Sequence, residues 1–266
     1  MLRDITIGQY YPVDSVIHKV DPRVKILATF VFIAALFIVK NFIAYSYVFV
    51  FLAAAIILSK VPISYMLRGL KPLFMIIILT VTINIFMTKG EVIYPLGPLE
   101  ITKEGVYQAA FMAIRLILLI VGTSLLTLTT SPIQLTDGIE KLLNPFKKIG
   151  VPAHELAMMM TIALRFIPTL LEETDKIMKA QMARGADFES GNIVNRAKSL
   201  VPLLVPLFIS AFRRADELAM AMEARCYRGG ENRTRMKELS LHGRDFVASA
   251  VTVMVLVAVI VDRIVK

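Results

Sequence analysis

Met182-Ala183-Arg184-Gly185 and Glu223-Ala224-Arg225-Cys226 end two long segments with apolar residues at helical spacing, and a polar loop follows each of them. When the chain is shifted by 41 residues, Ala183 falls on Ala224 and Arg184 falls on Arg225. A match over one short window is weak evidence of duplication. It gains weight here because each arginine stands at the end of a long helix with an apolar face. We therefore expect two parallel stalks with an arginine at each tip, suited to two similar sockets.

The segments that lead to these tips run from Ala153 to Arg184 and from Asn192 to Arg225. The second segment carries Ala211, Ala215 and Ala219 at steps of four, and small residues on one stripe allow two helices to approach closely. Both segments have charged flanks, which favours helices that lie along the membrane interface over helices that span it. We expect the two helices to cross each other.

The composition places the chain in a membrane. Of its 266 residues 56% are hydrophobic, and the mean hydropathy of +0.67 lies well above that of soluble domains. Five apolar runs approach the roughly 20 residues that cross a bilayer: Ile26–Val39, Phe42–Leu58, Pro72–Met87, Val106–Thr130 and Phe246–Val261. The first two are short, so a single re-entrant segment is the alternative there. The prediction is an all-α integral membrane protein with about five transmembrane helices and a cytosolic or interfacial pair of long crossing helices.

Three domains follow from this pattern: a membrane domain of four spans over 1–130, a cytosolic domain over 131–244, and a last transmembrane helix over 245–266. Lysine and arginine number 4, 3 and 17 in segments 1–25, 59–71 and 130–244, against 1, 2 and 2 at Lys40, 88–105 and 262–266. By the positive-inside rule the amino terminus and residues 131–244 are cytosolic and the carboxyl terminus is outside. Residues 88–105, rich in glycine and proline, are expected to form an external loop of turns.

Several function classes find no support in the sequence. No phosphate-binding loop of the Gly-x-x-x-x-Gly-Lys-Ser/Thr type is present. The predicted spans contain no Asp, Glu or His for a proton relay. The chain has one cysteine, and its three histidines are far apart, so neither a disulfide nor a metal cluster is expected. The basic charge of +9 fits membrane orientation better than nucleic-acid binding. An enzyme is poorly supported.

Arg115 is the only ionisable residue inside a predicted span. A charge there is functional by default, so a secondary transporter or channel acting alone, with Arg115 in the substrate path, is the alternative function. The simpler interpretation is that Arg115 reaches the interface or bonds backbone carbonyls. Met158, Met159 and Met160 belong to a methionine-rich pair of helices, and such surfaces repack against different partners. Methionine that merely fills a core is the other interpretation.

The helix macrodipole favours a cation at each tip, but it would favour lysine equally. Arginine offers five donors in a planar fork, which suits bidentate binding of a carboxylate on another protein. The preceding alanine keeps the neck narrow, and Gly185 allows the chain to turn at once with positive φ. These features predict docking tips at Arg184 and Arg225.

The paired motifs, together with Asp21-Pro22-Arg23 and Lys25 before the first apolar run and Arg115 in a span, resemble the transmembrane T component of energy-coupling factor (ECF) transporters. The resemblance covers nearly the whole chain. These transporters import vitamins and transition-metal ions in prokaryotes, so it implies a plasma-membrane location. One departure is Cys226, which stands where the first motif has glycine.

The resemblance implies a non-catalytic scaffold that binds two ABC-type ATPase subunits and a membrane-embedded substrate-binding S component. The residues it assigns to the ATPases are Ala183, Arg184, Gly185, Ala224, Arg225 and Cys226. Arg115, Met158, Met159 and Met160 are expected to pack against the S component or within the membrane. The chain itself is expected to bind no cofactor, since ATP and Mg²⁺ would be bound by the ATPases.

Overall fold

The computed structural model describes residues 10–96, 99–188, 198–230 and 239–265. By its internal contacts the chain divides into two compact units. Residues 10–138 and 239–265 form the first, which we call the membrane unit, and residues 139–230 form the second, the coupling unit. Each is described by itself.

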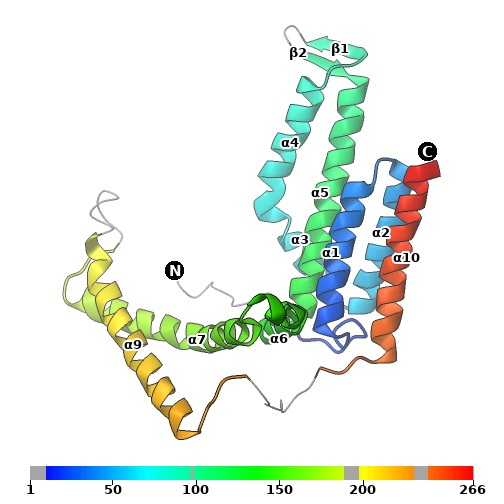
Figure 1. The fold of residues 1–266 in the computed structure, drawn as a ribbon. Helices are drawn as coiled ribbons and strands as arrows, with labels where there is room; N and C mark the ends of the chain where they lie inside the picture. The colour runs from blue at the N-terminus through cyan, green and yellow to red at the C-terminus, as the bar shows by residue number, and fades with distance from the viewer. Residues whose placement is uncertain (1–9, 97–98, 189–197, 231–238, 266) are drawn as a thin grey trace. The chain divides into compact units, whose positions relative to one another are not determined.

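The membrane unit is a bundle of helices. They are α1 (Pro22–Ile38), α2 (Phe42–Ser59), α3 (Ile63–Arg68), the 3-10 turn η2 (Lys71–Leu73), α4 (Phe74–Met87), α5 (Lys103–Thr129) and α10 (Gly243–Val265). In Figure 1, α1, α2, α5 and α10 stand side by side, and α4 lies along α5. Apolar side chains from these four helices form a buried cluster that includes Leu36, Val48, Leu118 and Val259. The outward faces remain apolar and exposed, as a bilayer solvent requires.

Local chemistry explains where the first helix starts. Pro22 stands at the first helical position, where its missing N–H is not needed. Asp21 caps the helix, because its carboxylate accepts a hydrogen bond from the Arg23 N–H at 2.9 Å.

We expected residues 88–105 to form only a loop of turns, and this expectation is wrong, because two strands lie within them. Strands β1 (Val92–Leu96) and β2 (Leu99–Thr102) pair as an antiparallel hairpin. The prolines and glycines of this stretch predict turns, yet β-branched Val92, Ile93 and Ile101 favour extended backbone. Four- and five-residue strands are too short to show a clear alternation in the sequence.

The described residues contain five helices long and apolar enough to cross a membrane: Phe42–Ser59, Ile63–Met87, Lys103–Thr129, Ala153–Ala183 and Gly243–Val265. The prediction of an all-α membrane protein with about five such helices is therefore confirmed. The five are not the same five, however. Helix α1, with 17 residues, is at the short end of the lengths that cross a bilayer and is not among these five. Helix α7 (Ala153–Ala183), predicted to lie at the interface, is long and apolar enough to span.

The coupling unit consists of α7, α9 (Val201–Ala224) and the 3-10 segment η3 (Asn144–Ile149), with the second half of α6 (Pro132–Leu143), which contains the boundary between the units. Helix α6 and η3 were not predicted. Helix α9 begins at Val201, and residues 192–197 of the segment predicted from Asn192 lie outside the described part of the chain.

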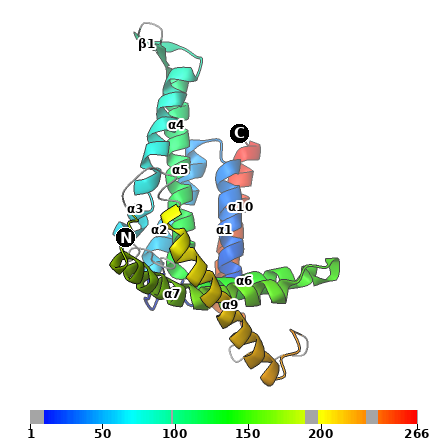
Figure 2. The ribbon, with the colours of Figure 1, turned by 90° about the vertical axis from the view of Figure 1, so that its left-hand side faces the viewer.

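Helices α7 and α9 cross each other, as predicted (Figures 1 and 2). The chain runs through them in opposite senses. Gln181, near the end of α7, donates a hydrogen bond to the carbonyl of Pro202 at the start of α9. Glu173 and Arg214 meet further along both helices, with 2.7 Å between Oε2 and Nη2. The expected parallel stalks are therefore wrong: the two arginine tips lie at opposite ends of the crossed pair.

Candidate functional site

The two arginine tips have the same backbone. Arg184 caps α7 with φ −91° and ψ 7°, and Arg225 caps α9 with φ −92° and ψ 11°. After the first tip, the N–H of Gly185 donates to the carbonyl of Met182 and that of Ala186 donates to Gln181, at 3.0 and 2.9 Å.

The same two bonds close the second tip, 41 residues later. The N–H of Cys226 donates to the carbonyl of Glu223 at 2.8 Å, and that of Tyr227 donates to Met222 at 3.0 Å. This pair of bonds defines a Schellman motif, which satisfies the last carbonyls of a helix. The sequence repeat is thus a repeat of structure.

Gly185 and Cys226 both occupy the left-handed region that this turn requires, with φ of 88° and 54°. Glycine adopts it freely, whereas a side chain brings Cβ close to the following carbonyl. The departure from glycine at Cys226 therefore leaves the turn intact and adds strain to it.

Both tips are open to solvent. Ala183, Arg184, Ala224 and Arg225 are exposed, and nothing lies within 4 Å of a Cβ built on Gly185. Within the part of the chain that the structure describes, neither tip guanidinium forms a hydrogen bond or an ion pair. Each therefore presents its full set of donors on a narrow neck, which suits insertion into a groove of another protein.

The tips are spaced evenly about the crossing of the helices. Arg184 lies eleven residues after Glu173, and Arg225 lies eleven residues after Arg214. At 1.5 Å per residue each arm is about 16 Å long. Glu173 and Arg214 are themselves equivalent positions of the 41-residue repeat.

The second tip is tethered to the start of α7. The Tyr227 hydroxyl donates to Met158 Sδ at 3.0 Å and lies 3.2 Å from His154 Nε2. The other ring nitrogen of His154 lies 3.1 Å from a carboxylate oxygen of Glu140. Gly230 is packed so closely on the His154 ring that a Cβ there would overlap it. The first tip has no such tether in the described residues.

The three methionines do not act together. Met158 is engaged by Tyr227, Met159 is 55% exposed, and Met160 is half-buried. Consecutive residues of a helix point in different directions, so the three cannot form one face.

Arg115 lies in the membrane unit, on α5. Its guanidinium donates to the hydroxyl of Tyr45 at 3.3 Å and to the carbonyl of Val39, the residue that ends α1, at 3.2 Å. The ring of Phe111 stacks against it, with 5.1 Å from Cζ to the ring centroid. Arg115 therefore fastens the end of α1 to α5, in line with the simpler of its two interpretations.

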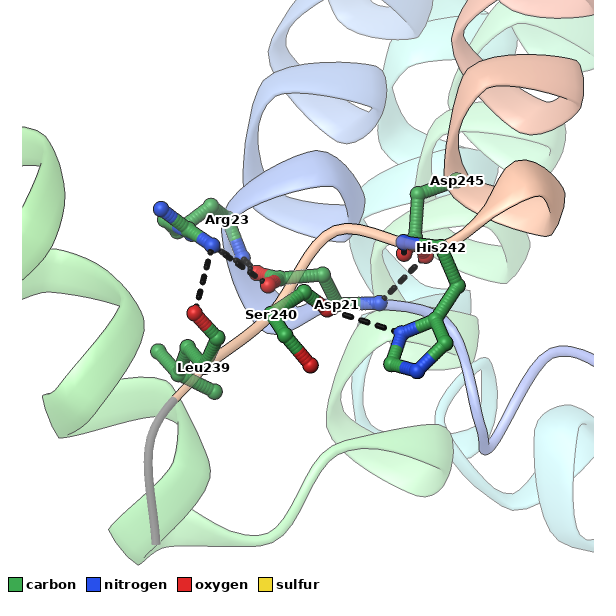
Figure 3. A network of polar contacts seen from close by, with 6 residues as sticks. All are labelled: Asp21, Arg23, Leu239, Ser240, His242 and Asp245. Carbon is green, nitrogen blue, oxygen red and sulfur yellow. Dashed lines mark hydrogen bonds and ion pairs between the residues drawn. The ribbon is translucent and has the colours of Figure 1, made fainter.

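Sequence reasoning missed a polar network at the other end of α1 (Figure 3). The N–H of Asp21 donates to Asp245 Oδ1 at 2.8 Å, and the N–H of His242 donates to Asp245 Oδ2 at 2.7 Å. Arg23 pairs with the Asp21 carboxylate at 2.8 Å and also donates to the carbonyl of Leu239. This network joins the start of α1 to the start of α10.

Two opposing effects set the pKa of Asp21. Burial alone would raise it, but the hydrogen bonds and charge of Arg23 outweigh burial and hold the pKa below its ordinary value. Asp21 is therefore ionised at neutral pH. Two features of the sequence are signals for this network. Asp21-Pro22-Arg23 stands before the first apolar run, and Asp245 stands directly before the last apolar run.

No group of three or more His, Cys, Asp or Glu side chains able to hold a metal ion occurs among the described residues.

Comparisons with known proteins agree on one family. The family described as CbiQ, cobalt transport protein, matches residues 14–236. The energy-coupling factor transporter transmembrane protein EcfT of Thermosediminibacter oceani is 67% identical over 262 residues, which cover 98% of this chain and 99% of that protein. Proteins of the same name are 63% identical in Clostridium kluyveri and 49% identical in Bacillus subtilis, with 99% and 98% of this chain covered and 98% of each relative.

Proposed function

This chain belongs to the family of energy-coupling factor transporter transmembrane proteins, and on that premise we propose that it is the scaffold subunit of an ATP-driven importer of vitamins or other micronutrients. In this proposal the chain is not catalytic. It couples two ABC-type ATPase subunits to a membrane-embedded S component that binds the substrate. ATP and Mg²⁺ are bound by the ATPases.

One observation carries the proposal: two Schellman turns with the same hydrogen bonds each present an exposed arginine on an alanine neck, and neither arginine has a partner among the described residues. Two like tips call for two like sockets, and a pair of ATPase subunits supplies them. Arg184 and Arg225 each donate to a carboxylate in a groove of one ATPase. Ala183, Gly185, Ala224 and Cys226 keep the necks slender enough to enter.

The orientation in the plasma membrane is part of the proposal. The amino terminus and residues 131–244 face the cytosol, where the ATPases bind, and the carboxyl terminus lies outside. The distribution of lysine and arginine along the chain supports this arrangement. Arg115 and the methionines Met158–Met160 lie on helices that would contact the S component.

The alternative, a channel or secondary transporter with Arg115 in its path, has less support. The donors of Arg115 are directed at the end of α1, at Tyr45 and at Met112. A residue engaged in this way stabilises the bundle and leaves no free guanidinium for a passing anion.

Affinity purification in mild detergent tests the proposal. The wild-type chain is expected to recover two ATPases and one or more small membrane proteins, identified by mass spectrometry. The double variant Arg184→Ala with Arg225→Ala is expected to lose the ATPases.

The matched control is Arg165→Ala with Arg213→Ala, which removes two exposed arginines from the same two helices away from the tips. It is expected to retain both ATPases. Normal recovery of the ATPases with the tip variant would refute the docking role of the arginines.

A further inference from the structure

The membrane unit contains an open-sided cavity of about 440 Å³ among its helices, away from Arg115. It lies where the starts of α1 and α10 meet the ends of α2 and α5. The sequence predicts that this end of the bundle faces the cytosol. In Figure 1 it is the lower end of α1, α5 and α10.

The walls of the cavity are apolar. Phe32, Leu52 and Leu125 line its interior, and the exposed side chains Leu58 and Val247 stand at its rim. The volume falls in the range of sites that hold small ligands. A long hydrocarbon chain fits such a lining, and the bilayer around the bundle supplies one.

The polar groups of the cavity include two cations at its cytosolic end, Lys25 and Arg244. The Lys25 ammonium is occupied, since it donates to the carbonyls of His18 and Thr129 at 3.1 and 2.9 Å. Arg244 is different. It is exposed, and no hydrogen bond or ion pair engages it anywhere in the described ranges of the chain.

The carboxylates of Asp245 and Asp21 form no ion pair with Arg244. Asp245 is 1% exposed and accepts from the backbone N–H groups of Asp21 and His242. The carboxylate of Asp21 is paired with Arg23. The mouth of an apolar cavity therefore carries a cation that has no partner among the described residues, at the level expected for the lipid headgroups of the inner leaflet.

We propose that this cavity binds one anionic phospholipid, with an acyl chain between α1, α2, α5 and α10 and the phosphate on Arg244. The apolar lining selects the chain, and arginine matches the geometry of a phosphate. The bound lipid fills space between the four helices and stabilises the bundle. The site is independent of the arginine tips and of the ATPases.

Native mass spectrometry of the full chain tests the site. The protein is released from nanodiscs made of equal parts phosphatidylglycerol and phosphatidylcholine. The wild type is expected to retain one phosphatidylglycerol in preference to phosphatidylcholine. Arg244→Gln is expected to reduce that preference about fivefold, the factor that corresponds to roughly 1 kcal/mol for one cation near a lipid surface.

The control is Arg263→Gln, which removes an exposed arginine from the other end of the same helix. It is expected to leave the preference unchanged. Equal retention of both lipids by the wild type, or equal loss in the two arginine variants, would overturn the proposal.

A second pair of variants separates the acyl chain from the headgroup. Ala248 lines the cavity and Ala250, on the same helix, does not. Ala248→Phe is expected to abolish lipid retention, whereas Ala250→Phe is expected to preserve it. Retained phosphatidylglycerol in a folded Ala248→Phe protein would show that the lipid lies elsewhere.

Discussion

Glu173 and Arg214 are joined by an ion pair at the crossing of α7 and α9, and each lies eleven residues before the arginine that ends its own helix. Both tips therefore lie at the same distance along their helices from this ion pair. Its side chains are 22% and 32% exposed, so the pair contributes only about 0.2–1 kcal/mol. That is too little to decide folding but enough to influence an angle between helices.

Reversing one charge of this pair is expected to disturb the tips. Glu173→Arg places two like charges at the crossing, while Glu173→Arg with Arg214→Glu restores attraction. Spin labels at Cys226, the only cysteine of the chain, and at Ala186→Cys report the separation of the tips. We expect a broader distance distribution in the single variant and recovery in the double. Identical distributions in all three proteins would contradict a role for the pair.

The two tips are expected to act together as one bivalent ligand. Once one tip has docked, the other binds at a high effective concentration, so Arg184→Ala or Arg225→Ala alone weakens ATPase binding less than the pair does. Truncating one buried charge pair costs about 2–5 kcal/mol. Titration of purified ATPases onto each variant in nanodiscs measures the loss. If one single variant matches the double, the second tip makes no contribution.

Cys226→Gly is expected to stabilise the second tip. The left-handed backbone at this residue costs a side chain about 1–2 kcal/mol, and glycine removes that cost. Hydrogen exchange of the Tyr227 N–H, which is bonded to Met222, reports the stability of the turn. The exchange should slow about fivefold or more. Exchange of the Ala186 N–H, in the first tip, is the internal control and should not change.

Acid is expected to loosen the junction of α1 and α10. The pKa of Asp21 is lower in the folded chain than in the unfolded chain, so its contribution to stability is complete above about pH 4 and declines as pH falls through the folded pKa. Asp21→Asn removes this contribution at every pH, with an expected loss of about 1–3 kcal/mol. Thermal denaturation of both proteins between pH 7 and strongly acidic pH checks this, and the two curves should converge at the acidic end.

Arg115→Met is expected to destabilise the bundle without creating or removing a transport path. The substitution leaves the buried Val39 carbonyl without its side-chain donor, a loss of about 1–3 kcal/mol. The melting temperature should fall relative to that of the Arg263→Gln control. Anion flux into liposomes by the chain alone, absent in the variant, would instead support the channel.

The sequence predicted what short-range chemistry decides. The glycine after Arg184 indicated the turn, and the match at Arg225 indicated a second one, since a Schellman motif involves only six neighbouring residues. Apolar runs predicted α1, α2, α4, α5 and α10 to within four residues, because burial in lipid requires length and composition alone, but they did not predict that α7 is also long and apolar enough to span.

Contacts between distant residues could not be predicted in the same way. Asp21 and Asp245 are 224 positions apart, and the residues around either one do not predict a contact with the other. The sense in which α7 and α9 cross depends on how the chain returns between them. Helix α6 was missed because polar residues separate its apolar ones, so its twelve residues form no apolar run, although their spacing is helical.

The two arginine tips lie at equal distances from the crossing of α7 and α9, and this affects how a partner protein can bind them. Two rods that touch at equivalent points are exchanged by a half-turn about the line that bisects them, so the tips are related by an approximate twofold axis. A symmetric pair of partner subunits would therefore fit this scaffold in either of two orientations. Among the described residues, two differences between the tips distinguish one orientation from the other: Gly185 against Cys226, and the tether at Tyr227. A partner built of two different subunits would resolve that ambiguity, because each arm ends in a different turn.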